Sequence, residues 1–428
     1  MPKTTLADKL KSLGVKVGST EIKPPEPKAR SGIPIEEVLD GRWNVTPRGD
    51  AFVSETRYPL EYRHGIAPLF SPAPLHNLAS WAGDARLRDM PLKQFAFLDT
   101  ETSGLAGGTG TYAFLIGVGR FEKTDEGEDF HLAQFFMRDP AEEPALLAAL
   151  ESFLAPCEAL VTFNGKAFDA PLLSTRYRLH QMLIPFADFS HVDLLPLARR
   201  LWRDRLPSRA LKYLEENVLS APRTVEEVPG YEIPYLYFDF LRTGDATPLK
   251  GVFYHNAMDV VAMTALFSHM AGLLADPHAH DHEFGLDVVA LAKLFEDMGM
   301  WEDAARLYER GLEIGLPEEG FWEAVRRLSI LQRRRGDLDS ALKLWEKAAD
   351  EGHIYAHIEL SKHFEHRMRD PRMALHWAKS AHKLALAPTL LPYERKHWEE
   401  DLAKRIERLE SKVRATKGKP AKKKKSGA

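Results

Sequence analysis

The chain has 428 residues, of which 44% are hydrophobic and 28% charged, and its formal net charge is −4. This length is typical of two domains, and this charge balance excludes a protein that coats nucleic acid through bulk positive charge. The single cysteine, Cys157, excludes an internal disulfide framework and is typical of a reducing compartment. The N-terminus has no apolar signal core, and no stretch approaches the ~20 apolar residues of a membrane span, so we expect a cytoplasmic protein.

The two ends of the chain differ in composition from the rest. Residues 1–35 mix Lys, Pro and Ser and are predicted to be a flexible leader. Residues 412–428 hold eight Lys and Arg residues and no acid, so the remaining chain has 50 bases, 62 acids and a net charge of −12. We expect this last segment to be a disordered basic tail that adds non-specific attraction to nucleic acid.

Residues 36–276 are predicted to form an α/β unit. Scattered aromatic and turn residues in 36–90 indicate an N-terminal extension of short strands and loops, packed on a domain at 91–276. In that domain strands come first, and strands then alternate with helices, which implies a mixed sheet. The predicted strands are 95–98, 113–121, 131–137 and 159–163, and the predicted helices are 142–154, 169–180, 194–202 and 260–274.

A basic cluster follows the third of these helices. It would either track phosphates or form a solvated helix face, and the sequence leaves both interpretations open. Its members are Arg199, Arg200, Arg203, Arg205, Arg209 and Lys212.

Residues 284–411 are almost wholly helical in pattern, and they repeat. Segment 304–310 aligns with 341–347 at a shift of 37, and 374–379 follows at a shift of 33. A period in the mid-thirties resembles tetratricopeptide-type helical repeats. Such arrays usually bind proteins, so we expect a protein partner here; the alternative is a plain helical cap on the first domain.

Two acids end the first predicted strand. The apolar run 95–98 leads directly into Asp99 and Glu101. Residues two apart lie on the same side of a strand, so these carboxylates converge, and burying ionised carboxylates unpaired is costly. A cation that prefers hard oxygen ligands, Mg²⁺ or Mn²⁺, would offset their repulsion. The pattern therefore predicts a metal-dependent active site.

Two further acidic segments follow along the chain. In the first, a strand, an Asn164-Gly165 turn and a helix opening near Asp169 would bring that carboxylate to the edge of the sheet. In the second, Asp259 lies early in a helix with His255 four residues before it. If the helix covers both residues, they are neighbours on one helix face.

Together the three segments resemble the motifs of the DEDD, or DnaQ-like, 3′–5′ exonuclease superfamily of the ribonuclease H-like fold. Residues 99–105 match its Asp-x-Glu-Thr-(Thr/Ser)-Gly-Leu motif, and the segments ending at Asp169 and Asp259 resemble its other two. Segments 191–195, 211–215 and 229–234 also resemble the bacterial YprB-like ribonuclease H-like proteins, which can carry a helical-repeat tail. The resemblance implies a mixed five-stranded sheet flanked by helices, followed by an all-α tetratricopeptide-like domain.

The resemblance also implies a cofactor and its ligands. Asp99, Glu101, Asp169 and Asp259 would hold two Mg²⁺ or Mn²⁺ ions, which suits the hydrolysis of phosphodiester bonds. The residues expected to bind substrate are Thr102, Gly104, Leu105, Asn164, Phe168 and Asn256.

The general base is less clear from the motif. One subclass has His five residues before the last Asp and the other has Tyr four before it, whereas this chain has Tyr254 at five and His255 at four. We favour His255, because its spacing suits one helix face and the ordinary pKa of histidine lies near neutrality. Tyr254 is the alternative base.

The leading hypothesis is a metal-dependent 3′–5′ exonuclease acting on single-stranded DNA or RNA. One alternative is a structure-specific endonuclease of the same fold. The other is an inactive nuclease-fold scaffold that binds proteins through its helical repeats. The intact set of four carboxylates argues against the scaffold, because an inactive site would not need to hold them together.

Overall fold

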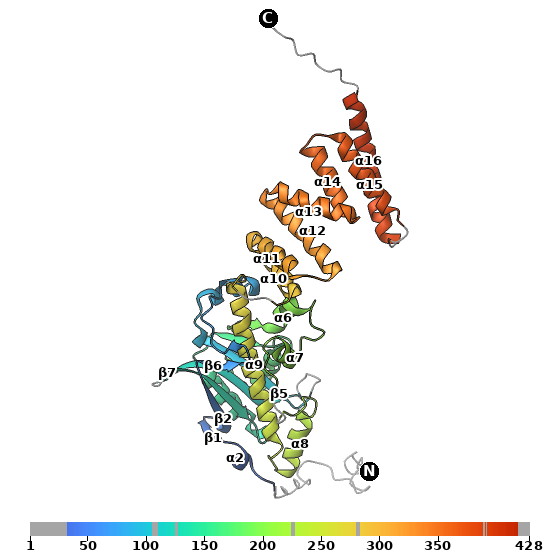
Figure 1. The fold of residues 1–428 in the computed structure, drawn as a ribbon. Coiled ribbons are helices and arrows are strands. Elements are labelled where there is room, and N and C mark those ends of the chain that lie inside the picture. Colours follow the sequence, from blue (N-terminus) through green and yellow to red (C-terminus); the bar gives the residue numbers. More distant parts are fainter. Residues whose placement is uncertain are drawn as a thin grey trace, which may run out of the picture.

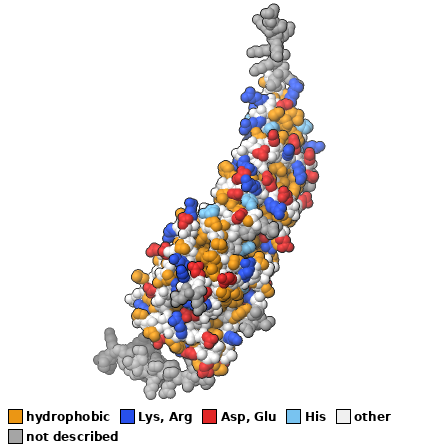
Figure 2. All heavy atoms as spheres, turned by 60° about the vertical axis from the view of Figure 1, so that its left-hand side comes forward, with side chains coloured by type: hydrophobic (Ala, Val, Ile, Leu, Met, Phe, Trp, Pro, Cys, Tyr) orange, Lys and Arg blue, Asp and Glu red, His pale blue; other side chains and the backbone are white. Residues whose placement is uncertain are grey.

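The computed structural model describes residues 32–417, apart from 105–109, 125–126, 224–226, 280–282, 388–389 and 391. Most of the expected leader and basic tail lies outside these residues. Figure 1 shows a sheet flanked by helices at one end of the molecule, from which a row of helices extends to α16 at the other end. Acidic and basic side chains are mixed over the face shown in Figure 2.

The central sheet is mixed and has seven strands in the order β1-β2-β7-β6-β5-β8-β9. Strand β5 pairs antiparallel with β6 and parallel with β8, so it lies near the middle. The strands are β1 (Arg42–Thr46), β2 (Gly49–Pro59), β5 (Phe95–Thr102), β6 (Ala113–Thr124), β7 (Gly127–Phe136), β8 (Ala159–Thr162) and β9 (Ser190–Asp193); β3 (Arg63–His64) and β4 (Ala67–Pro68) form a separate pair.

The sheet is wider than the five strands that the resemblance implied. The two additional strands come from the N-terminal extension: β2 pairs antiparallel with β7, and β1 pairs with β2 as the outer strand. Ala51, Phe52 and Val53 of β2 are almost fully buried, so this part of the extension belongs to the core of the sheet. It does not lie on the surface of the next domain as loops and short strands.

Helices cover both faces of the sheet. α9 crosses β5, β6 and β7 on one face, and α4 packs on β1, β2 and β7 on the other. The helices of this part are α2 (Ile35–Val38), α3 (His76–Ala82), α4 (Glu143–Leu154), α5 (Asp169–Leu179), α6 (Leu194–Trp202), α7 (Leu211–Asn217), α8 (Ile233–Thr243) and α9 (Leu249–Ala275).

Helix α9 is the longest of these, and it begins eleven residues before the predicted 260–274 helix. Its length and composition would allow it to cross a membrane, but 72% of its most apolar window is buried inside the protein. Phe267 of α9 packs against Phe95 and Phe97 of β5, with ring centroids 5.6 and 5.4 Å away. α9 is therefore the core helix that supports the central strand.

The remaining helices pack as consecutive neighbours. α10 packs on α11, α12 on α13, and α14 on α15, and α16 covers α15. The three repeated segments found in the sequence lie on α11, α13 and α15, the second helix of each pair. The helices are α10 (Gly285–Asp297), α11 (Trp301–Ile314), α12 (Glu318–Arg335), α13 (Leu338–Asp350), α14 (Ile354–His366), α15 (Pro371–Ala385) and α16 (Pro392–Lys417).

The sheet and the first helical pairs share one apolar core. The cluster that contains Phe97 continues through α9 into α10, α11 and α12, as far as Leu331. Ion pairs reinforce the junction: Arg205 lies 2.8 Å from Asp287, and Arg200 pairs with Asp297. These two arginines of the basic cluster therefore bind α10.

Truncating a core side chain of α9 should strongly destabilise the protein. Leu266 is 0% exposed, so Leu266→Ala should lower the free energy of unfolding by about 2–5 kcal/mol through lost burial and a residual cavity. The matched change Leu183→Ala, at a side chain 86% exposed, should alter it by no more than about 0.5 kcal/mol. Urea denaturation followed by circular dichroism measures both, and equal costs would contradict the core position of α9.

Candidate functional site

The polar end of β5 carries two of the candidate ligands. Phe95 to Leu98 are fully buried, whereas Asp99 and Glu101 are partly exposed. The alternation of the strand places both carboxylates on the same side as Phe95 and Phe97, which is the side that α9 covers. The register between β5 and β6 shifts directly after Glu101, and such a bulge bends the strand and redirects the side chains beside it.

Helix α9 brings a histidine and a third carboxylate to these two. Ligand atoms of Glu101, His255 and Asp259 all lie within 4.8 Å of one another. His255 Nδ1 lies 3.1 Å from the backbone oxygen of Val228, and its Nε2 lies 3.5 Å from Asp259. In the tautomer that donates Nδ1–H to Val228, Nε2 carries the lone pair and faces the carboxylates.

The alternative base, Tyr254, lies on another side of α9. Its hydroxyl is near those of Tyr58 and Tyr62, and burial together with Tyr62 and Tyr254 raises the pKa of Tyr58 to about 12. A ring nitrogen of His255, in contrast, lies within 4.8 Å of ligand atoms of Glu101 and Asp259. The geometry therefore favours His255 as the residue that would act on a water molecule at this site.

Asn256, which was expected at the substrate, is fully buried instead. Its amide nitrogen donates to Asp99 Oδ2 at 3.0 Å, and its oxygen accepts from Gln134 at 2.9 Å. Gly117, opposite Asp99 on β6, makes room for it, since a Cβ there would lie 2.3 Å from the Asn256 oxygen. Asn256 thus holds the Asp99 carboxylate in place and does not face a substrate.

Asp169 reaches the site from α5, on the other side of the sheet. It is the first residue of that helix, and its Oδ1 accepts a 2.5 Å hydrogen bond from Thr100. Thr100 lies between the two ligand positions of β5 and points to the opposite face of the strand. Asp169 is therefore close to the pair at the edge of the sheet, as the sequence pattern predicted.

The turn before α5 is held by a buried acid. Asn164 has a left-handed backbone (φ 69°), and a Cβ at Gly165 would lie 2.5 Å from Thr162. Asp193 accepts hydrogen bonds from the backbone N–H groups of Asn164 and Lys166 at 2.8 and 3.1 Å. Asn164, proposed as a substrate contact, therefore shapes this turn through its backbone.

The four other expected substrate contacts are Thr102, Gly104, Phe168 and Leu105, and they differ in their surroundings. The hydroxyl of Thr102 donates to the backbone oxygen of Gly104 at 3.1 Å, which fixes the end of β5. The Phe168 side chain, directly before Asp169, is 61% exposed and is available for contact. Leu105 lies outside the described residues.

Crowding of like charges governs the electrostatics of the site. Burial and three neighbouring carboxylates raise the pKa of Asp99 well above its ordinary value. Burial, Asp259 and Asp169 raise the pKa of Glu101 to about 8, and burial raises that of Asp169 to about 6 against the opposing hydrogen bond from Thr100. Carboxyl groups in such surroundings either keep their protons near neutral pH or bind a metal cation in place of the protons.

Sequence reasoning missed a buried arginine that contacts this cluster. The guanidinium of Arg223 donates to Asp259, to Glu215 at 2.5 Å and to Glu227 at 2.7 Å, and its side chain is only 2% exposed. Burial alone would lower the pKa of Arg223, but Asp259 and Glu215 raise it, so it remains a cation. Its one sequence signal, a basic residue in a long loop, does not reveal a partner 36 positions away.

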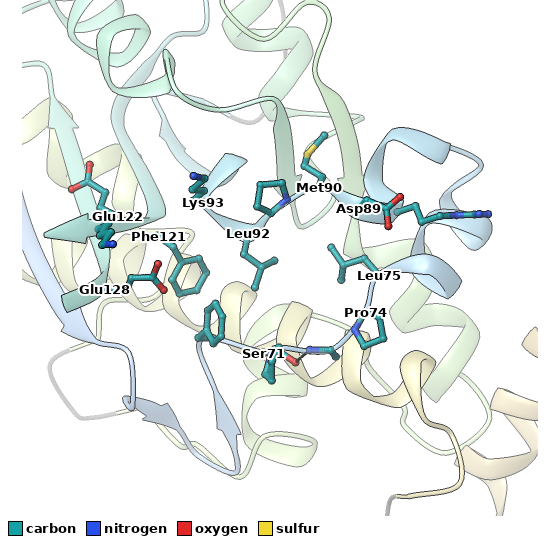
Figure 3. Close-up of a pocket in the computed structure, with 16 residues that line it drawn as sticks. Ser71, Pro74, Leu75, Asp89, Met90, Leu92, Lys93, Phe121, Glu122 and Glu128 are labelled. Atoms are coloured by element: carbon teal, nitrogen blue, oxygen red, sulfur yellow. Dashed lines mark hydrogen bonds between the residues drawn. The ribbon is translucent and has the colours of Figure 1, made fainter.

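A hollow of about 490 Å³ lies away from this site. Figure 3 shows Leu75, Leu92 and Phe121 facing its centre. Leu92 precedes the first residue of β5, so the hollow lies at the opposite end of that strand from Asp99 and Glu101. The carboxylate cluster, not this apolar hollow, is the candidate active site.

Comparisons with known proteins agree with this architecture. A model of the RNase H superfamily matches residues 96–271, a range that includes all four carboxylates. The chain is 34% identical over 341 residues to the uncharacterized protein YprB of Bacillus subtilis (strain 168), covering 77% of this chain and 79% of YprB.

A solved structure is similar to part of the chain. It is the family B DNA polymerase from the hyperthermophilic archaeon Pyrobaculum calidifontis, with a TM-score of 0.31, 15% identity, and coverage of 49% of this chain and 30% of the polymerase. That likeness is too weak to carry functional information. The superfamily match and the similarity to YprB over most of both chains show that this protein belongs to the RNase H superfamily, in the family that includes YprB.

Proposed function

We propose that this protein is a metal-dependent 3′–5′ exonuclease of the DEDD type that acts on single-stranded nucleic acid. Membership of the RNase H superfamily implies a hydrolase acting on nucleic acids, and RNase H-like nucleases generally use divalent metals. The finer assignment is supported by one observation above all. Asp99, Glu101, Asp169 and Asp259, from three separate segments, meet at one end of β5 together with His255.

The donor set suits Mg²⁺ or Mn²⁺. These ions prefer carboxylate oxygens, and the raised pKa values of Asp99 and Glu101 show how poorly the protein alone neutralises the cluster. We propose that the four carboxylates hold two ions. When bound, two such ions would activate the attacking water and stabilise the leaving oxygen in phosphodiester hydrolysis.

The protein side chains would have separate tasks. His255 would accept the proton of the attacking water at Nε2, because its Nδ1 is engaged by Val228. Asn256 would keep the Asp99 carboxylate oriented, since it is buried and bonded to it. Arg223 would offset the negative charge of Asp259 and hold its carboxylate in position.

We also make proposals for the role of the helices α10–α16 and for the cellular compartment of the protein. We propose that α10–α16 form a tetratricopeptide-like array that binds a protein partner, and that the protein acts in the cytoplasm. The repeated segments on α11, α13 and α15 support the first of these, because repeat arrays usually present a binding surface.

Removing a ligand or the base should abolish or strongly reduce cleavage. With 5′-labelled single-stranded DNA and RNA and Mn²⁺, the parent should yield a ladder that shortens from the 3′ end. Asp99→Asn should reduce cleavage to background, and His255→Ala should slow it about 100- to 10,000-fold, the usual contribution of a general base. Tyr254→Phe should stay near the parental rate.

One control variant and two alternative outcomes make this test decisive. Asp50→Asn, the same change at an exposed residue of β2, should leave the rate unchanged. Discrete internal products from the parent would favour the endonuclease alternative. Absence of metal-dependent cleavage by folded parent protein would favour the inactive scaffold.

Metal-free protein should lose stability as the pH rises. The pKa of Glu101 is about 8 in the folded state against an ordinary 4.5, and that of Asp169 is about 6 against 3.8. At a pH between the ordinary and the folded-state pKa of either group, the folded state binds more protons than the unfolded state. The free energy of unfolding therefore falls as the pH rises from about 4.5 to about 8.

Thermal unfolding in EDTA and in Mn²⁺, from pH 5 to 8.5, measures this dependence. The Tm in EDTA should fall across the range, and Mn²⁺ should raise it most at the alkaline end, because the ion replaces the protons. Glu101→Gln should flatten the EDTA curve. A parental curve no steeper than that of Glu101→Gln would contradict the raised pKa.

Removing the arginine beneath the cluster should destabilise the fold. Arg223→Met would leave Glu215, which is 0% exposed, with only the His64 ring at 2.6 Å as a partner and should cost about 3–5 kcal/mol of unfolding free energy. Arg203→Met is the matched control: Arg203 is 73% exposed and pairs with Asp204 at 3.4 Å, so its loss should cost at most about 1 kcal/mol. Urea denaturation compares them, and equal costs would show that Arg223 is not a structural counter-charge.

A further inference from the structure

An exposed aromatic stripe lies on α8 and the residue pair before it. Tyr231, Tyr235 and Phe238 have side chains 72%, 71% and 47% exposed. Tyr235 and Phe238, three residues apart, lie on one side of the helix and are separated by a rise of only about 4.5 Å. Tyr231 lies in the turn directly before the helix. The opposite side of α8 is buried in the core through Ile233, Tyr237 and Phe240.

The buried side fixes α8 firmly, so the exposed rings have a rigid base. Tyr237 stacks on Phe114 of β6 with ring centroids 3.9 Å apart and planes 4° from parallel, and its hydroxyl donates to the backbone oxygen of Met137. Helix α8 also packs against α9 and β5, and Figure 1 shows it beside the first half of α9. A ring on the outer side of this helix therefore has a set position relative to the carboxylates.

The stripe begins next to the candidate base. The backbone of Val228 accepts the His255 hydrogen bond, and a Cβ at Gly230 would lie 3.8 Å from His255 Cε1. Tyr231 is the next residue along the chain, and α8 follows it. The exposed rings thus continue outward from the point where the loop covers His255.

A further exposed ring lies directly beside one of the candidate ligands. Phe168, 61% exposed, directly precedes Asp169. Two exposed lysines lie on the segments that carry the candidate ligands: Lys166 in the turn before α5, and Lys250 in the first turn of α9, five residues before His255. Aromatic faces together with nearby cations are the two elements that single-strand binding surfaces combine.

We propose that Tyr231, Tyr235 and Phe238 form a surface on which the bases of a single-stranded DNA or RNA stack as the strand enters the active site. This inference rests on the proposed function, which makes single-stranded nucleic acid the substrate. It adds that the bases of that strand are the part that α8 contacts. In a duplex the base faces are stacked inside the helix and are not accessible to these rings. The stripe therefore selects unpaired strands because it contacts their bases. The carboxylate site does not supply such a contact.

The test is binding without cleavage. In an Asp99→Asn background with Mg²⁺, fluorescence anisotropy follows a 5′-labelled 12-nucleotide thymidine strand, the same strand with abasic sites throughout, and a duplex of the same length. Tyr235→Ala and Phe238→Ala should each weaken binding of the thymidine strand about 5- to 150-fold, the usual range for the loss of one base–aromatic stack. They should not change binding of the abasic strand, which retains the phosphates.

Tyr393→Ala is the matched control, because Tyr393 lies on the distant α16 and is 70% exposed, like Tyr235. It should not affect binding, and all three variants should keep the parental Tm since they alter exposed side chains. The inference is overturned if the α8 variants bind the thymidine strand as the background does, or if they weaken the abasic strand equally. It is also overturned if the duplex binds as tightly as the single strand.

Failure of the proposed function gives a different pattern. If unmodified protein does not cleave but the α8 variants still lose affinity for the thymidine strand, the stacking surface stands and the exonuclease does not. If unmodified protein cleaves and the α8 variants bind and cleave with parental KM, the exonuclease stands and the stacking surface is wrong.

Discussion

Mutual repulsion among carboxylates is the constraint on which the rest of this structure depends. Asp99, Glu101, Asp169 and Asp259 lie together at one end of β5 although they come from three segments, and their proximity raises the cost of ionising Asp99, Glu101 and Asp169. The fold keeps them there by rigid support from all sides. α9 is anchored along the sheet by its buried apolar side, and α5 is joined to β5 through Thr100.

Around this cluster the protein uses residues that touch no substrate. Gly117 has no side chain, which allows Asn256 to reach Asp99, and Asp193 ties the turn that leads to α5. Arg223 supplies a buried positive charge that offsets one side of the repulsion. Such supporting groups set the positions of ligands more narrowly than the ligands themselves can, because each fixes an orientation through hydrogen bonds.

Short-range patterns predicted the elements that carry the site, and long-range pairings escaped prediction. The strand that carries Asp99 and Glu101 and the helix that begins at Asp169 follow from local periodicity and motif. The repeated helices are recognisable because their segments recur. By contrast, the strands β1 and β2 join the sheet only through β7, and Arg223 meets Asp259 only in the folded chain. Asn256 was expected to contact substrate because the motif around it does not reveal that its side chain is buried in the folded chain. The metal, the base and the stacking surface remain predictions.

The shared apolar core joins α10–α12 directly to the sheet, so these helices are not attached to it through a flexible linker alone. A flexible linker would let an attached partner sample a broad range of distances from the carboxylates, with an effective concentration set by linker length. Here, a molecule bound by these helices would lie at a more constant distance and direction from the carboxylates at the end of β5. Its own dimensions, not the length of a linker, would then decide whether a strand that it carries extends to the site.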